Sequence, residues 1–428
     1  MNRRSPFALL LSLAVVLSSH AFAANWPAWR GPLGTGLCEE KNLPTTWSKT
    51  ENVKWRVALP EPGNSTPIVW NDRIFVTQAV GDRRTLMCFQ RADGKLLWQE
   101  GITAKEKDPT HPTNPYCSAS PVTDGERVLV SFASEGLYCY DFAGKELWKR
   151  TDLGRQIHIW GNASSPVIHG DLCFLNFGPG ETTYLLAVDK KTGATKWRHD
   201  EDTGYGKPLP PDAPASKGGN SFIGSWTTPV IAPVEGNEQL LMSWPQRLAA
   251  YDPQAGKELW SCSGLNPLVY TSPILGDGMV VSMGGYGGPA MAVRAGGSGD
   301  ITASRRVWLQ PKGPQRIGSG VVFDGHVYIH NDPATAMCID LKTGEPVWTE
   351  RLKGAASTGQ NWSSVMLADG LCYTITQGGD CFVFKASPNF ELVAVNSLGE
   401  RSNSSIVPSN GELFVRTHAA LYCIGAKK

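Results

Sequence analysis

The chain has 428 residues, enough for a sizeable hydrophobic core, and its formal charge at pH 7 is +1. This balance excludes the strongly basic surface of a protein that binds nucleic acid or an anionic membrane. The 46 Gly, 30 Pro and 15 Trp residues, without long helical periodicity after the N-terminus, predict an all-β, turn-rich fold.

The first residues have the pattern of a secretory signal peptide. Arg3 and Arg4 precede an apolar run at 7–17, and Ala21-Phe22-Ala23 matches a small-x-small cleavage site. We expect a signal peptide at 1–23, an N-terminal extension at 24–50, and a single repeat domain at 51–428. The protein is then exported to the periplasm or the extracellular space, by the Sec or the twin-arginine route. No Cys lies directly after the cleavage site, so we expect no membrane anchor after cleavage.

One motif recurs along the chain, as in Ala187, Asp189, Gly193 and Trp197. The Asp side chain can accept hydrogen bonds from the backbone N–H groups of its own turn. The Gly supplies a positive φ, and the Trp buries a large apolar surface. We assign a structural docking role to the tryptophans that mark these repeats: Trp55, Trp98, Trp148, Trp197, Trp260, Trp308 and Trp348. A degenerate copy places Val383, Lys385, Asn389 and Val393 at the four motif positions.

Each repeat opens with Ser or Thr and then has a hairpin signal. The opening residues are Thr66, Ser120, Ser165, Thr228, Ser272, Ser319, Ser364 and Ser405. Turn pairs such as Asp277-Gly278 and Asn410-Gly411 are typical of type I′ hairpins. Units of about 40–50 residues with four strands predict a β-propeller. We count eight four-stranded antiparallel blades, and we expect the isolated strand around Trp55 to complete the last blade and close the ring.

The ten cysteines are interpreted as core thiols rather than a disulfide framework, although their pairing stays open. Cys88, Cys139, Cys338 and Cys423 occupy the small position of the repeat, and four residues in one buried register do not easily pair with one another. The sequence contains no Cys-x-x-Cys, so it predicts neither a zinc ribbon nor covalently attached haem.

The loops that enter the first strands carry the candidate ligand residues, because they meet around the central channel on one face. We predict that Asn64, Tyr116, Trp160, Asn162, Trp226, Arg316, Asn361 and Trp362 form this face, to which Tyr270, Gln360, Arg401 and Asn403 also contribute. Insertions at 102–116 and 199–222 should emerge there as well. Rings and amides suit a planar polar ligand or a peptide, but they could equally be wedges and turn caps. No catalytic pair and no metal-ligand set has a recognisable spacing.

The repeat resembles the tryptophan-docking motif of quinoprotein alcohol dehydrogenases and other PQQ-repeat propellers. The opening Trp26-Pro27-Ala28-Trp29 and Asn361-Trp362 also resemble exported bacterial PQQ-like propellers, which are related to the propeller lipoprotein of the outer-membrane assembly machine. The resemblance implies a PQQ cofactor with calcium, a Trp such as Trp160, Trp226 or Trp362 stacked on the quinone, and Arg316 pairing its carboxylates. The adjacent Cys-Cys of the dehydrogenases and the acylated Cys of the lipoprotein are missing.

Two functions remain open at this point. The first is a monomeric binding or scaffold module that holds another protein or a small polar ligand at its channel face. The alternative is a PQQ-dependent dehydrogenase, an oxidoreductase with a reduced active site. A lyase or glycosidase would need a carboxylate pair, and the sequence identifies none.

Overall fold

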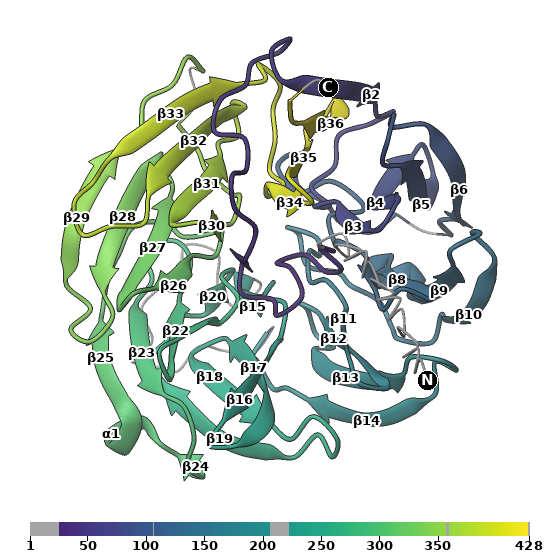
Figure 1. The fold of residues 1–428 in the computed structure, drawn as a ribbon. Helices are drawn as coiled ribbons and strands as arrows, with labels where there is room; N and C mark the ends of the chain where they lie inside the picture. Colours follow the sequence, from purple (N-terminus) through teal and green to yellow (C-terminus); the bar gives the residue numbers. More distant parts are fainter. Residues whose placement is uncertain (1–24, 106, 206–221, 357–358, 427–428) are drawn as a thin grey trace, which may run out of the picture.

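The computed structural model describes residues 25–105, 107–205, 222–356 and 359–426. The expected signal peptide lies outside these residues, and so does the centre of the second insertion, 206–221. The described chain forms a ring of eight four-stranded antiparallel blades with very little helix (Figure 1), which confirms the predicted all-β, eight-bladed propeller. No helix in the described part is long and apolar enough to cross a membrane.

The first four blades follow the sequence order, each from its innermost to its outermost strand. Their strands are β3 (Ile68–Trp70), β4 (Arg73–Val80), β5 (Arg83–Gln90) and β6 (Leu96–Thr103); β7 (Val122–Thr123), β8 (Arg127–Ser131), β9 (Leu137–Asp141) and β10 (Glu146–Arg150); β11 (Val167–His169), β12 (Leu172–Phe177), β13 (Tyr184–Asp189) and β14 (Thr195–Asp200); and β16 (Val230–Val234), β17 (Asn237–Trp244), β18 (Arg247–Tyr251) and β19 (Glu258–Ser263). A 3-10 turn, η1 (Ala133–Glu135), joins β8 to β9.

Blades five to seven repeat the pattern, and the last sheet combines both ends of the chain. Their strands are β21 (Ile274–Gly276), β22 (Met279–Met283), β23 (Ala290–Arg294) and β25 (Arg306–Gln310); β26 (Val321–Phe323), β27 (His326–Asn331), β28 (Thr335–Asp340) and β29 (Pro346–Arg351); and β30 (Met366–Ala368), β31 (Leu371–Ile375), β32 (Asp380–Lys385) and β33 (Leu392–Ser397). In the eighth sheet, β34 (Val407–Ser409), β35 (Glu412–Arg416) and β36 (Ala420–Ile424) are followed by β2 (Val53–Ala58), which pairs antiparallel with β36.

Five short elements lie outside this pattern. β1 (Leu37–Cys38) pairs with β30, β24 (Gly299–Asp300) pairs with β19, and β15 (Gly224–Ser225) pairs with β20 (Leu268–Val269), in each case parallel. The helix α1 (Thr302–Arg305) follows β24. β24 and α1 belong to an insertion in the fifth blade that the sequence analysis did not single out.

A closed ring of hydrogen bonds joins the eight inner strands. The backbone N–H of each opening Ser or Thr donates to the hydroxyl of its counterpart in the next blade, over 2.9–3.1 Å. The last bond runs from Ser405 to Thr66, which lie 339 residues apart in the chain. These hydroxyl groups, which we call the fastening hydroxyls, thus connect each blade to its neighbour by a hydrogen bond.

We call the boundary between two neighbouring blades a seam. In six seams an indole N–H crosses the boundary and donates to a backbone carbonyl in the next blade's turn, over 2.9–3.0 Å: Trp55, Trp98, Trp148, Trp197, Trp308 and Trp348. In five of these a glycine of the receiving turn lies against the ring, as Gly256 lies against Trp197. The small residue of the motif lies directly across from the Trp, as in Cys88↔Trp98 and Ala187↔Trp197.

The seam between blades four and five differs. Trp260 is fully buried, but its N–H donates 2.8 Å to Gln239 Oε1 of its own blade. Its ring packs with Val280 and Val293 of blade five and with Ile301 from the β24–α1 insertion. The insertion therefore covers this indole in place of a tight turn.

The register assigned to the degenerate repeat of blade seven is wrong by one residue. Val383 pairs with Ala394 rather than with Val393, because the turn before β33 is one residue longer than in the regular repeats. Val393 is 40 % exposed, and Asn389 is not among the residues with positive φ. The seam between blades seven and eight thus has alanine where the other blades have tryptophan.

The N-terminal extension crosses one face of the ring (Figure 1). The Trp26 backbone pairs with Val69 of blade one, and Gly36 O accepts from the Leu367 N–H of blade seven. Arg30 is buried and donates from Nη2 to the carbonyls of Thr35 and Gly320. The extension thereby links blades one, six and seven across the mouth of the channel.

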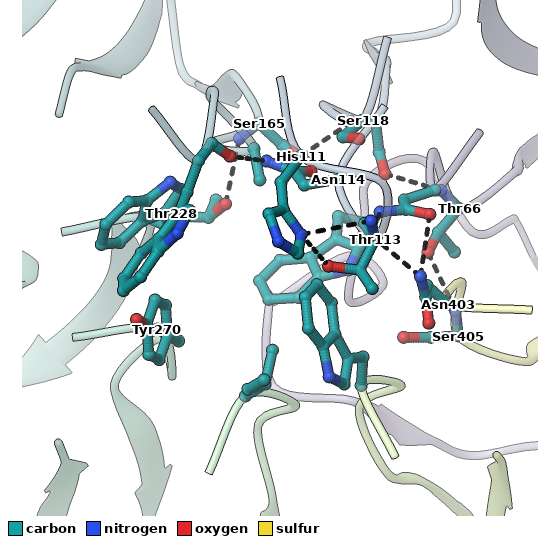
Figure 2. A pocket seen from close by; sticks show the side chains of 18 of the residues that line it. Thr66, His111, Thr113, Asn114, Ser118, Ser165, Thr228, Tyr270, Asn403 and Ser405 are labelled. Carbon is teal, nitrogen blue, oxygen red and sulfur yellow. Dashed lines mark hydrogen bonds between the residues drawn. The ribbon is translucent and has the colours of Figure 1, made fainter. Parts of the chain in front are cut away.

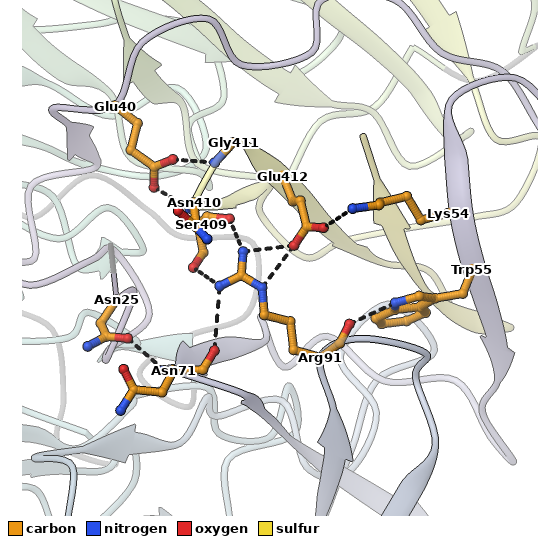
Figure 3. Close-up of polar contacts among 10 residues, drawn as sticks. All are labelled: Asn25, Glu40, Lys54, Trp55, Asn71, Arg91, Ser409, Asn410, Gly411 and Glu412. Atoms are coloured by element: carbon orange, nitrogen blue, oxygen red, sulfur yellow. Dashed lines mark hydrogen bonds and ion pairs between the residues drawn. The ribbon is translucent and has the colours of Figure 1, made fainter. Parts of the chain in front are cut away.

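Hairpin turns of the first and last blades hold the ends of this crossing segment (Figure 3). The Glu40 carboxylate accepts from the N–H groups of Asn410 (2.8 Å) and Gly411 (2.6 Å), and Asn25 Oδ1 accepts from the Asn71 N–H over 2.7 Å. Nearby, Arg91 of blade one forms an ion pair of 2.7 Å with Glu412 of blade eight.

Candidate ligand-binding site

A cavity of about 410 Å³ lies on the ring axis where the loops entering the first strands converge. This volume falls within the range of roughly 300–1,000 Å³ that is usual for small-molecule sites. Trp29 of the N-terminal extension is among its lining residues. Because the extension crosses the hairpin-turn face, we identify Trp29 as the floor of a pocket that opens on the opposite, loop-bearing face.

An aromatic wall forms one side of the cavity. Trp160, Trp226, Tyr270 and Tyr286 come from the loops of blades three, four and five, and all four line the cavity. Their ring centroids lie 5.8 Å apart for Trp160–Trp226, 5.0 Å for Trp226–Tyr270 and 5.5 Å for Tyr270–Tyr286. Rings at these distances form a continuous packed surface.

His158 packs against this wall and helps to fix it. Its ring centroid lies 4.7 Å from that of Trp226 in an edge-on arrangement. Its Nδ1 accepts a hydrogen bond from the backbone N–H of Trp160 over 3.2 Å. Burial lowers the pKa of His158 to about 4, so the ring is neutral at pH 7 and can accept this bond. The Trp226 indole donates 2.8 Å to Gly161 O, which fixes the second ring.

An amide wall forms the other side (Figure 2). Asn64 and Asn403 both donate from Nδ2 to Thr113 O, over 2.8 and 3.0 Å, and Asn114 Nδ2 donates 2.6 Å to Trp160 O. His111 contacts Thr113 Oγ1 at 2.7 Å. His111, Thr113 and Asn114 belong to the predicted insertion 102–116, which therefore folds inward and connects blades one, three and eight over the cavity.

The fastening hydroxyls lie between the two walls. Five of the eight line the cavity: Thr66, Ser120, Ser165, Thr228 and Ser405. Each accepts a backbone N–H from the preceding blade and keeps a hydrogen of its own that can be donated. Three buried polar side-chain atoms of lining residues have no hydrogen-bond partner among the described residues: Tyr270 OH, Trp362 Nε1 and Asn403 Oδ1.

The predicted channel-face residues divide into two groups. Asn64, Trp160, Trp226 and Trp362 line the cavity, as do Tyr270, Gln360 and Asn403. Tyr116 and Asn162 instead line a smaller neighbouring pocket, where the Arg84 guanidinium lies 3.7 Å from the Tyr116 ring centroid. Asn361 is fully buried and donates from Nδ2 to His330 O over 2.7 Å. Arg401 is not among the lining residues.

Arg316 bears directly on whether the cavity fits PQQ. Its side chain is buried outside the cavity lining, and Nη1 donates 2.9 Å to Gly288 O. Burial lowers the pKa of Arg316 to about 10, which leaves it protonated at pH 7. Trp160, Trp226 and Trp362, which were expected to stack on the quinone, do line the cavity. Arg316, which was expected to pair with the carboxylates of PQQ, does not. No group of three or more His, Cys, Asp or Glu residues in the described chain could hold a metal, so these residues do not fit a carboxylated quinone with calcium.

Sequence reasoning missed four further kinds of lining residue. Trp29 lies in the extension, and nothing in its local pattern places it on the ring axis. His111, Thr113 and Asn114 lie in an insertion whose direction depends on its contacts. Tyr286 lies in the glycine-rich turn before β23, and Gln315 precedes β26. Gln315 could have been predicted from the sequence, because it lies next to Arg316 in an entry loop that was already assigned to the channel face.

The fold and the cavity together define a PQQ-repeat β-propeller with a ligand-sized pocket on its axis. A family model described as outer membrane protein assembly factor BamB matches residues 40–177 and 82–350, and the chain belongs to this family. No curated protein matches the chain.

Solved structures show the same fold at low sequence identity. BamB from Moraxella catarrhalis is 13 % identical, with a TM-score of 0.59 over 87 % of this chain and 96 % of that one. A europium-containing methanol dehydrogenase is 12 % identical, with a TM-score of 0.68 over 94 % and 98 %. Quinohemoprotein alcohol dehydrogenase from Comamonas testosteroni is 13 % identical, with a TM-score of 0.65 over 95 % and 81 %. At these identities the likeness establishes the fold alone.

Proposed function

We propose that this protein is an exported binding module that takes a small ligand, or an extended segment of another protein, into its central cavity. The observation that carries the proposal is the cavity itself, which opens on the loop-bearing face and has Trp29 at its floor and an aromatic wall beside an amide wall. Concave sites of this size, largely preformed and lined by rings with a few convergent polar groups, are the usual form of a binding site.

Export is supported by two observations. The sequence at 1–23 has the pattern of a signal peptide, and the matching family model is described as an outer membrane assembly factor. The propeller is then a periplasmic or extracellular protein, and we expect it to work as a monomer.

A fluorescence titration with three probes tests the binding function. The probes are neutral disaccharides, tripeptides with blocked termini, and PQQ with calcium. Four tryptophans line the cavity, so a ligand that enters it should change the intrinsic fluorescence saturably. A lack of saturable response to all three probes would overturn the binding proposal.

Ala163→Phe is a blocking variant that works for any class of ligand. Ala163 lines the cavity, so a ring at this position should fill space that a ligand needs and abolish the response. Ala143→Phe is the matched control, because Ala143 is an exposed turn residue outside the cavity. Equal responses in both variants would place binding elsewhere and contradict the proposal.

The same titration separates binding from the dehydrogenase alternative. If PQQ with calcium quenches the fluorescence saturably and supports dye-linked alcohol oxidation, the enzyme replaces the binding module as the function. We expect PQQ to bind weakly or not at all, since Arg316 is directed into the protein and a carboxylate in the cavity would lose hydration without a counter-charge.

A further inference from the structure

The two walls of the cavity differ in chemistry, and this difference points to a class of ligand. Resting on the binding function proposed above, we infer that the cavity recognises a neutral saccharide. A pyranose ring has an apolar C–H face and a rim of hydroxyl groups. The cavity offers a matching pair of surfaces, because the rings of Trp160, Trp226 and Tyr270 pack together as one lining wall. Figure 2 shows Tyr270 and the Asn403 amide on different sides of the cavity.

The aromatic wall suits the C–H face of a sugar because its rings are held in place before the ligand arrives. Trp226 is fixed through its indole N–H to Gly161 O at 2.8 Å and by the edge of His158 at 4.7 Å. Rigid aromatic surfaces bury large apolar areas, and a wall that is already ordered loses little conformational entropy on binding. A sugar ring gains little from apolar contact alone, so its binding depends on a wall that costs little entropy to order.

The amide wall suits the hydroxyl rim because both can donate and accept. The Asn64 amide already donates to Thr113 O within the protein. Asn403 Oδ1 has no protein partner among the described residues and can accept a hydrogen bond, and the hydroxyls of Thr66 and Ser405 each keep a hydrogen that can be donated. A sugar hydroxyl donates one hydrogen bond and accepts others, so it can pair with both kinds of group.

The described lining contains no Asp, Glu, Lys or Arg, which favours a neutral ligand over an anionic one. Every described residue that lines the cavity is aromatic, an amide, a hydroxyl or an aliphatic residue, apart from His111. A phosphate or carboxylate group would leave water without a counter-charge here, and a neutral sugar has no charge to desolvate. Glycoside hydrolysis uses two carboxyl groups, and the described lining contains no Asp or Glu, so the inference is recognition without cleavage.

Tyr286 provides a test that leaves the fold intact. It lines the cavity, its ring lies 5.9 Å from Trp160, and its side chain is 45 % exposed on a turn, so its removal should not unfold the ring. Neutral disaccharides (cellobiose, maltose and N,N′-diacetylchitobiose) are titrated by calorimetry and fluorescence, with digalacturonate as the acidic counterpart. We expect at least one neutral disaccharide to bind and digalacturonate to bind at least tenfold more weakly.

The variants then locate the site. Tyr286→Ala should weaken binding of the neutral disaccharide by about two- to tenfold, which is the usual range for an aromatic contact. Tyr286→Phe keeps the ring and should stay within about twofold of the unaltered protein. Leu33→Ala is the control, since Leu33 is 70 % exposed on the extension and does not line this cavity, and it should change nothing.

The outcomes distinguish this inference from the function on which it rests. If no neutral disaccharide binds but blocked tripeptides quench the fluorescence, or PQQ quenches it without alcohol oxidation, the saccharide inference is wrong and the binding module stands. If no probe of any class binds, both fail. If a disaccharide binds with unchanged affinity in Tyr286→Ala and in the cavity-filling Ala163→Phe, the sugar site lies elsewhere and the inference is overturned.

Discussion

Six seams of the propeller and the seam between blades four and five bury the same kind of side chain in different ways. In the six, an indole that is mostly half-buried donates across the boundary to a tight turn, as Trp98 does to Phe142 O at 3.0 Å. In the seam between blades four and five, Trp260 has no exposed surface, donates within its own blade, and lies against the β24–α1 insertion.

This difference shows which part of the repeat is essential. Blade five has lost the Asp and Gly of the turn, yet the Trp that they would cover remains and is better buried than the others. The requirement at a seam is therefore an apolar cover over the indole together with one acceptor for its N–H. The tight turn is the compact way to meet this requirement, and an insertion with Gln239 as the acceptor is another.

Replacing Trp260 by Ala should have the largest effect on stability. A fully buried Trp leaves a large cavity, so we expect a loss of about 3–5 kcal/mol in the free energy of unfolding, measured by denaturant titration. Trp98→Ala is the comparison, and it should lose less because Trp98 is only partly buried. Equal losses would mean that the two kinds of seam are energetically equivalent.

A methyl group added at a tight turn should have the next largest effect. A Cβ at Gly256 would lie 2.5 Å from Trp197 Cδ2, and the residue has a φ of +67°. Gly256→Ala combines the cost of a positive φ with overpacking, about 2–4 kcal/mol together. Gly278→Ala isolates the first cost, since Gly278 has a φ of +73° with nothing within 4 Å of its Cβ. The melting temperatures of both should fall, and more steeply for Gly256→Ala.

Removing the acceptor at the exceptional seam should cost less than removing the ring. Gln239→Leu leaves the buried N–H of Trp260 without its 2.8 Å partner, and an unsatisfied buried donor costs about 1–3 kcal/mol. Chemical denaturation of this variant, and of Gln239→Glu, which keeps an acceptor, measures the effect. A stable Gln239→Leu would show that the cover alone is sufficient.

The smallest effect should come from the ion pair that attaches the insertion to blade four. Arg305 Nη1 lies 2.8 Å from Glu235 Oε1 and, with the Gly297 N–H, lowers the pKa of Glu235. The ionised carboxylate therefore stabilises the fold above its unfolded-state pKa of about 4.3, and this contribution is lost as the pH falls through the lower folded-state value. Glu235→Gln should melt slightly below the unaltered protein at pH 7, and the difference between the two melting temperatures should shrink as the pH is lowered. A difference that does not change with pH would point to packing.

The sequence was sufficient for the ring because each repeat has its own local signals. Turn pairs such as Asp277-Gly278 do have positive φ at both residues, and the Ser and Thr that open each blade do occupy equivalent places. The register of blade seven was wrong because Val393 and Ala394 are both apolar. Only the pairing partner distinguishes them, and pairing depends on a turn of unpredicted length.

The cavity was partly predictable, for a different physical reason. Entry loops converge by symmetry, so Trp160, Trp226 and Trp362 could be placed there from their phase in the repeat. The direction of a side chain within such a loop depends on contacts far away in the chain. Arg316 turns inward to Gly288 O, and Asn114 reaches Trp160 O from an insertion. Trp29 reaches the axis because the whole extension crosses the ring, which no local pattern specifies.

The hydrogen bond from Ser405 to Thr66 also bears on how the chain matures. This contact and the pairing of β2 with β36 join segments that lie far apart in the chain, 339 residues for Ser405 and Thr66. Contacts with such a large sequence separation form late and slowly, and the cavity lies at the centre of the circle that they complete. A chain that lacks β36 would carry most of the lining residues without a closed ring around them. Binding of the proposed ligand would therefore report that the ring has closed.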